Sequence, residues 1–438
     1  MADGSFVSRF FEFDRHQTSA TREIRAGIVI FLTMGYIMIA NPAILSQGGF
    51  PKDAATTATI LTVILGTVLM AFVARRPFAV APLMGENAFV AFTVCAALGY
   101  SWQTALAGIL ISSTLVTILS LTGARKFLME SIPLNLKYAL AVGIGLFLTF
   151  IGFNVAGIVT VGVPGAPVHL GKVTSPDVLV SLVGLIMLVL LVVRRVPGAI
   201  LLGIIITSII AFATGVAKMP DRVVSMPPSI QPTLFKFDFS QVLTAGFLPV
   251  LLTLFLMDFL DMMGSLIGCS SLAGFLDEKG NLPNAQAPLF VDSFSSVFGA
   301  CVGTTTAGTY IESAAGIQEG GRTGLTALTV AVLFAMSLFF APFLAAVPPQ
   351  AYGPALVVVG MLMLCPITKI DFGDYTELVP AFMIIALISF TYNIGVGMIA
   401  GFAIYPLGKI VARRAKEIPT GMWVLFLLSV LFFVFYKY

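Results

Sequence analysis

Long apolar segments, repeated from one end of the chain to the other, constrain this sequence more than any other feature. About fourteen of them run for roughly 16–22 residues, close to the ~20 that a helix needs to cross a bilayer. Of the 438 residues 58% are hydrophobic and only 10% are charged, against about 25% charged residues in soluble domains. Lipid has to cover so much apolar surface. The sequence therefore predicts an all-α polytopic membrane protein, because the short alternating segments of a membrane barrel are not seen.

The charged residues fit this interpretation. The predicted spans are 24–45, 54–74, 84–98, 103–122, 137–155, 177–193, 198–217, 247–268, 286–303, 309–319, 324–346, 353–366, 375–393 and 394–412. With a cytoplasmic N-terminus, 18 of the 24 Lys and Arg fall on the cytoplasmic side, five fall outside and Lys437 lies in the tail. This segregation obeys the positive-inside rule and predicts fourteen spans in an inner, cytoplasmic membrane. No cleavable signal is expected, and the apolar run 420–436 either crosses the bilayer or lies along it.

The two halves of the chain resemble each other in inverted orientation. Seven spans precede the polar loop 218–246 and seven follow it, so the halves enter the membrane from opposite sides. RRVPGAILLGIIIT (194–207) is similar to YNIGVGMIAGFAIY (392–405). The third span of each half is short and begins with helix breakers, in PFAVAPLMGENAF (77–89) and GTTTAGTYIESAAG (303–316). Paired interrupted spans of this kind indicate a transporter's binding site near the membrane midplane.

Acidic residues inside the spans are the candidate functional groups, because a charge at membrane depth is costly. Six of them are expected there: Glu86, Asp258, Asp261, Asp292, Glu312 and Glu377. No Lys, Arg or His is expected beside them within the spans, so they are predicted to face a cavity and to exchange protons. Asp258 and Asp261 share one helical face. Glu312 begins the second half-helix, where the helix N-terminus favours a carboxylate, and Asn87 takes the equivalent place in the first half.

Two of the six acids are not placed firmly at membrane depth by the sequence. Glu86 lies either at depth or at the cytoplasmic edge in contact with water, and Glu377 is expected at the interface. Carboxylates at the half-helices favour a neutral or cationic solute rich in N–H donors, and Phe89 offers a flat apolar face for a ring.

Other functions are weighed against this one. An anion exchanger of the same fold needs a cation near residue 312, but Arg322 is ten residues further along the chain. A cation channel would need a ring of acids, which an asymmetric cluster does not provide. An enzyme is least expected, because neither metal-ligand spacing nor a Ser/His/Asp set is present.

Four motifs carry a family resemblance that covers nearly the whole chain. They are FLTMGYIMIANPAIL (31–45), APLMGENAF (81–89), DFLDMMGSLIG (258–268) and GTYIESAAGIQEGGRTGLTA (308–327). They resemble the azaguanine-like purine permeases, a branch of the nucleobase–cation symporter family related to uracil and xanthine permeases. The sequence departs from the commoner APGMGLNAF at Leu83 and Glu86, which leaves adenine against guanine or hypoxanthine open.

The resemblance implies a domain organisation. Residues 1–130 (spans 1–4) and 240–346 (spans 8–11) would form a core domain that carries the substrate. Residues 131–239 (spans 5–7) and 347–438 (spans 12–14 and the apolar tail) would form a gate domain that also makes a homodimer. The third and tenth spans would each be a short strand followed by a half-helix.

The resemblance also implies a site for proton-coupled purine uptake. The expected substrate-binding residues, by side chain or backbone amide, are Asp261, Glu312, Asn87, Phe89, Thr309, Tyr310 and Ile311. The carboxylates would accept from purine N–H groups, and the ring would stack on Phe89. The expected proton-coupling residues are Asp261, Asp258, Asp292 and Glu312. No cofactor, metal or nucleic-acid partner is expected, and the choice between H⁺ and Na⁺ stays open.

Overall fold

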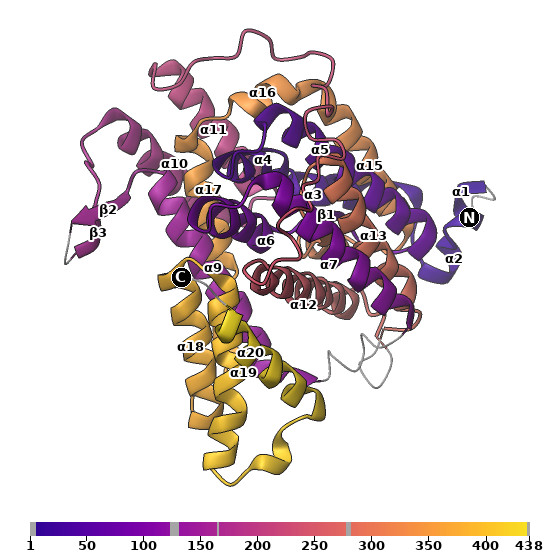
Figure 1. The fold of residues 1–438 in the computed structure, drawn as a ribbon. Coiled ribbons are helices and arrows are strands. Elements are labelled where there is room, and N and C mark those ends of the chain that lie inside the picture. Colours follow the sequence, from indigo (N-terminus) through magenta and orange to yellow (C-terminus); the bar gives the residue numbers. More distant parts are fainter. Residues whose placement is uncertain (1–5, 123–130, 164–165, 277–281, 436–438) are drawn as a thin grey trace.

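The computed structural model describes residues 6–122, 131–163, 166–276 and 282–435, which are mostly helical (Figure 1). In the first half the elements are α1 (Phe6–Phe10), α2 (Phe13–His16), α3 (Ala20–Met34), α4 (Ile37–Gln47), α5 (Lys52–Leu69), η1 (Met70–Ala74), β1 (Val80–Pro82), α6 (Met84–Ala88), η2 (Phe89–Ala97), α7 (Trp102–Thr122), α9 (Leu134–Val155), β2 (Val159–Val163), β3 (Ala166–Leu170), α10 (Pro176–Val193) and α11 (Ala199–Ala213).

The second half repeats this order after a long loop without regular structure. Its elements are α12 (Leu248–Leu272), α13 (Gln286–Val302), β4 (Ala307–Thr309), α14 (Ser313–Gln318), α15 (Gly324–Ser337), η3 (Leu338–Phe340), α16 (Ala341–Ala346), α17 (Pro349–Leu362), η4 (Cys365–Lys369), α18 (Tyr375–Thr391), α19 (Ile394–Val411), η5 (Ala415–Glu417) and α20 (Thr420–Phe435).

Each predicted span coincides with a helix, a helix pair or a strand with its half-helix. Within the described residues, nine helices are long and apolar enough to cross a membrane, and four further apolar helices are shorter. The predicted strands before the half-helices of spans 3 and 10 are confirmed as β1 and β4. The chain is therefore a multi-pass membrane protein.

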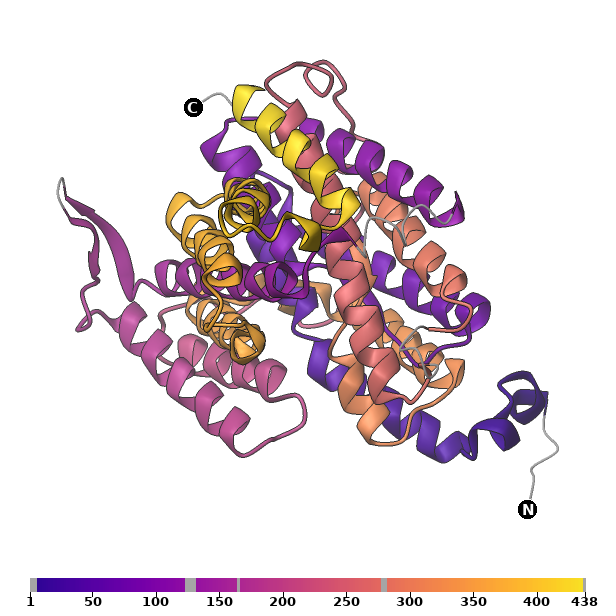
Figure 2. The same cartoon turned by 90° about the horizontal axis from the view of Figure 1, so that it is seen from below.

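The helices pack in two groups (Figures 1 and 2). Helices α9, α10, α11, α17, α18 and α19 contact mainly one another and lie on the side of the projecting hairpin β2–β3. Helices α3, α5, α7, α12, α13 and α15 form the other group, around β1 and β4. The groups touch where α3 meets α11 and where α12 meets α19. Their roles as a moving core and a fixed gate stay a prediction.

The two interrupted spans meet in an antiparallel pair of strands at the centre of the second group. Val80 pairs with Thr309, Ala81 with Gly308 and Pro82 with Ala307. Every residue of both strands is buried. The pairing gives hydrogen-bond partners to backbone that has left the helical conformation, which is a requirement at membrane depth.

A hydroxyl from the preceding helix holds each strand in the same way. Thr67 Oγ1 of α5 accepts from Val80 N–H at 3.0 Å and donates to Val80 C=O at 3.3 Å. Ser296 Oγ of α13 does the same with the N–H and C=O of Ala307, at 2.9 Å each. We call these contacts the two strand clamps. The matching clamps are a structural trace of the inverted repeat.

Candidate functional site

Glu312 lies between β4 and α14, at the second interrupted span. Its Oε1 accepts a hydrogen bond of 2.7 Å from the hydroxyl of Tyr36. Tyr36 sits at the break between α3 and α4, and its hydroxyl is also 3.4 Å from that of Tyr310. Tyr36 is a site residue that the sequence reasoning missed, although it lies within the motif 31–45.

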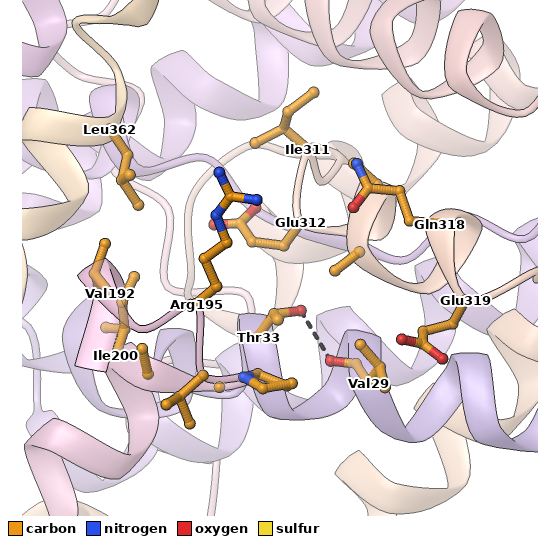
Figure 3. A pocket seen from close by; sticks show the side chains of 16 residues that line it. Val29, Thr33, Val192, Arg195, Ile200, Ile311, Glu312, Gln318, Glu319 and Leu362 are labelled. Atoms are coloured by element: carbon orange, nitrogen blue, oxygen red, sulfur yellow. Dashed lines mark hydrogen bonds between the residues drawn. The ribbon is translucent and has the colours of Figure 1, made fainter. Parts of the chain in front are cut away.

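Glu312 faces a cavity of about 470 Å³ between the two helix groups (Figure 3). One wall comes from α3, α14 and the residues beside α14; the other comes from α10, α11, their connection and the end of α17. The lining residues are Val29, Thr33, Val192, Arg195, Val196, Pro197, Gly198, Ala199, Ile200, Ile311, Glu312, Ala314, Ala315, Gln318, Glu319 and Leu362. The cavity is thus mostly apolar with a few polar groups, as small-molecule sites usually are.

Arg195 corrects one argument from the sequence. The expectation was that no cation lies near Glu312, because only distance along the chain could be judged. Arg195, on the α10–α11 connection, lines the same cavity as Glu312 (Figure 3). Folding thus places on one cavity two charged residues that lie in different halves of the chain.

The first half-helix is packed away from this cavity. Glu86 and Asn87 are fully buried in α6, and Phe89, which begins η2, is 1% exposed. Asn87 Oδ1 accepts a hydrogen bond from the Thr305 hydroxyl. None of these three residues lines the cavity. Because Glu86 is fully buried, it is not in contact with water, which was one of the two environments that the sequence left open.

The residues before Glu312 serve mainly the strand pair. The Thr309 hydroxyl lies 3.0 Å from both carboxylate oxygens of Asp292. The N–H of Tyr310 donates to Ala79 C=O at 2.9 Å, so this predicted substrate-binding amide already has a partner. The Asn87 N–H is likewise bonded to Leu83 C=O at 3.1 Å. Ile311 differs from them, because its side chain is 51% exposed and lines the cavity.

The predicted proton-coupling acids fall around β4. Asp258 Oδ1 is 3.2 Å from Ser296 Oγ, so Asp258 contacts the clamp of β4. Asp292 contacts β4 through Thr309. Asp261 lies on α12, one turn from Asp258, and its side chain is outside the described residues.

The second correction concerns Glu377, for which no basic partner within the spans was expected. Lys409 Nζ lies 2.8 Å from Glu377 Oε1, and Lys409 is almost completely buried in α19. Asn135 and Tyr405 also donate to Glu377. These contacts join α9, α18 and α19, so Glu377 belongs to packing within the first helix group and not to the cavity.

Glu23 is a buried acid directly before the first predicted span. Its carboxylate accepts from the backbone N–H groups of Arg322 and Thr323, at 3.0 Å each. The hydroxyls of Thr18 and Thr326 donate to it at 2.7 and 2.6 Å. Glu23 thereby ties α3 to the start of α15, directly after the half-helix that carries Glu312.

Comparison with known sequences adds family membership to this geometry. The sequence pattern of the Permease family matches residues 21–402. The chain belongs to the Permease family. This chain is 43% identical to the permease MJ0326 of Methanocaldococcus jannaschii. The alignment covers 99% of this chain and 98% of MJ0326.

Two further relatives have more specific names. The guanine/hypoxanthine permease PbuG of Bacillus subtilis is 38% identical over 98% of this chain and all of its own. The adenine permease AdeP of Escherichia coli is 35% identical over 98% of this chain and 96% of its own. Sequence similarity therefore extends over the whole permease.

Solved structures agree on the fold. The transmembrane domain of the cyanobacterial bicarbonate transporter BicA superposes with a TM-score of 0.61, at 18% identity, over 87% of this chain and 96% of that domain. The anion transporter Slc26a9 of mouse gives a TM-score of 0.63, at 11% identity, over 90% of this chain and 68% of its own. The permease thus has the fold of these transporters, with seven-plus-seven inverted repeats.

Proposed function

We propose that this permease imports purine nucleobases by proton symport across the cytoplasmic membrane. The observation that carries the proposal is Glu312, a carboxylate that faces a cavity at the second interrupted span. Full-length relatives named for guanine, hypoxanthine and adenine supply the substrate class. Purines present N–H groups on a flat ring, which a carboxylate beside apolar side chains binds well.

In this mechanism Glu312 accepts a hydrogen bond from a purine N–H group while Tyr36 holds the carboxylate in place. Asp261 supplies the second acceptor from α12. Asn87 and Phe89 do not line the cavity in this conformation, so in this mechanism they contact the ring only after the two helix groups have moved relative to one another. Because a buried unpaired charge is costly, uptake of a proton by Glu312 or Asp261 lets the loaded helix group move past the other.

The remaining parts of the proposal concern the membrane. With a cytoplasmic N-terminus, the positive-inside rule places Arg195 on the cytoplasmic side of the membrane. In this proposal the cavity lined by Arg195 and Glu312 opens to the cytoplasm, and this conformation is the one that releases substrate. The helix group of α9, α10, α11, α17, α18 and α19 forms the stationary gate and the homodimer contact. Asp258 and Asp292 support Asp261 on α12 and Glu312, which follows β4.

Anion transport is a second candidate, favoured by one observation. Arg195 puts a cation in the cavity, as an anion carrier of this fold would need. Against this candidate, BicA and Slc26a9 share only the fold at 18% and 11% identity, whereas the purine permeases align over nearly the whole chain.

The deciding experiment is uptake of labelled hypoxanthine, adenine and bicarbonate into proteoliposomes, with and without an inward pH gradient. Accumulation of a purine only with the gradient supports the proposal. Bicarbonate uptake without purine uptake, by folded and inserted protein, would replace it with anion transport. Purine uptake that follows a sodium gradient would overturn the proton coupling alone.

A further inference from the structure

The cavity has opposite charges on its two walls. Of the 16 residues drawn around it in Figure 3, Arg195 is the only basic one, and the acids are Glu312 and Glu319. Glu319 is 3.1 Å from the guanidinium of Arg25. Arg195 makes no ion pair with another residue of the described ranges, and it is exposed. Its guanidinium donors are therefore available to a ligand that Glu312 also contacts.

Helix termination explains the backbone of Arg195 but not the direction of its side chain. Arg195 is left-handed, with φ of 53°, and ends α10 by donating to Val192 C=O at 2.8 Å. Arg413 ends α19 in the same way, with φ of 59° and a bond of 2.9 Å to Ile410 C=O. Arg413 does not line the cavity, so a substitution of Arg413 tests the role at the helix end alone.

The space between the two charges suits a flat ring with donors on one edge and acceptors on another. Ile311 and Leu362 turn exposed apolar side chains to the cavity, at 51% and 45% exposure. A guanidinium donates two parallel hydrogen bonds, and the O6 and N7 acceptors of guanine or hypoxanthine match them. Adenine has an amino donor in place of O6, so the same edge opposes an arginine.

We propose that Arg195 is a specificity-determining residue that binds the O6/N7 edge of a 6-oxopurine while Glu312 accepts from an N–H group of the same ring. The cavity then favours guanine and hypoxanthine over adenine. This inference rests on the proposed purine transport and adds a preference within that substrate class.

The test measures binding of hypoxanthine and of adenine to the purified full-length permease by calorimetry. In Arg195→Gln the Kd for hypoxanthine rises on the order of ten-fold, the value of one paired arginine contact to a purine, and that for adenine does not rise. Arg195→Lys keeps a cation whose donors can reach the same two acceptors, so its loss for hypoxanthine is smaller than that of Arg195→Gln. Arg413→Gln, the matched control, leaves both affinities unchanged.

Two results overturn the inference while purine transport stands. They are a wild-type preference for adenine and an unchanged hypoxanthine-to-adenine ratio in Arg195→Gln. Adenine binding that persists in a variant shows that the variant is folded, so the ratio is compared only between proteins that bind adenine. If the folded wild type binds neither base, the proposed function itself fails.

Discussion

The two interrupted spans have the same local structure but lie in different environments. Both have a short strand, a clamp from the preceding helix and a half-helix. In the first, Glu86, Asn87 and Phe89 are buried and away from the cavity. In the second, Glu312 and Ile311 line it. The comparison teaches that repeat symmetry positions the backbone, whereas packing against the other helix group decides which copy meets the ligand.

The largest expected effect is on transport, and it tests whether the two interrupted spans differ in role. Glu312→Gln removes a charged acceptor and should lower purine accumulation by roughly 100-fold or more, as loss of a buried charged partner does. Glu86→Gln, at a buried acid of the first half-helix that does not line the cavity, should retain measurable uptake. Both are read as uptake into proteoliposomes with equal amounts of inserted protein. Equal losses in the two variants would show that the copies do not differ in role.

The clamps provide the sharpest test of the symmetry. Thr67→Val and Ser296→Ala each leave the N–H and C=O of one buried strand residue without a side-chain partner, which should cost about 2 kcal/mol of stability. Denaturant or thermal unfolding of the purified variants measures the loss. Thr33→Val is the control, since the Thr33 hydroxyl bonds only to carbonyls of its own helix. A clamp variant as stable as this control would contradict the equivalence.

A substitution of Tyr36 tests how much this residue contributes to holding Glu312 in place at the second interrupted span. Tyr36→Phe keeps the ring and removes the hydroxyl that donates to Glu312, so purine affinity should fall about ten-fold, the value of a hydrogen bond to a charged group. Titration of the purified protein with the transported base measures it. An unchanged affinity would mean that Glu312 is positioned by the strand pair alone.

The smallest effect lies far from both copies, at the start of α18. The Thr376 hydroxyl and then Arg414 lower the pKa of Asp374, and Arg414 lies 2.5 Å from its Oδ2. A lowered pKa means that Asp374 stabilises the folded state above its ordinary pKa of about 4, and that this is lost as pH falls below it. Asp374→Asn should therefore flatten the decline of melting temperature between about pH 5 and 3.

In the same variant, transport at neutral pH should stay at the wild-type level, because Asp374 does not line the cavity. Lower transport there would extend the functional region into the group of α9, α18 and α19. Such a result would weaken the contrast between the two interrupted spans.

Several features of the fold follow directly from local sequence. Gly303 is an example: its φ is 101° and a Cβ there would lie 2.2 Å from Thr233, so only glycine lets α13 end and the chain turn into β4. The breakers before Glu312 and Asn87 likewise predict that both spans are interrupted, because proline and glycine act on their own backbone, and the family resemblance adds that the interruptions are strands. The position of Glu312 at the start of α14 could be predicted for the same reason.

Contacts between distant segments could not be predicted in this way. Tyr36 and Glu312 lie in different halves of the chain, and so do Arg195 and Glu312. Glu377 was expected without a basic partner, since Lys409 stands at the edge of a different span. Which hydroxyl or cation meets a carboxylate depends on how whole helices are packed.

The sequence by itself determined a multi-pass helical membrane protein, its inverted repeat and its family. Hydropathy, charge segregation and motifs are properties of single segments or of their order, so they can be read without coordinates. Only the tertiary structure decided that Glu312 faces a cavity while Asn87 and Phe89 do not, and that Arg195 stands on the opposite wall. The physical reason is that exposure within a membrane protein is set by the contact of two helix groups, and that contact joins residues that the sequence keeps far apart.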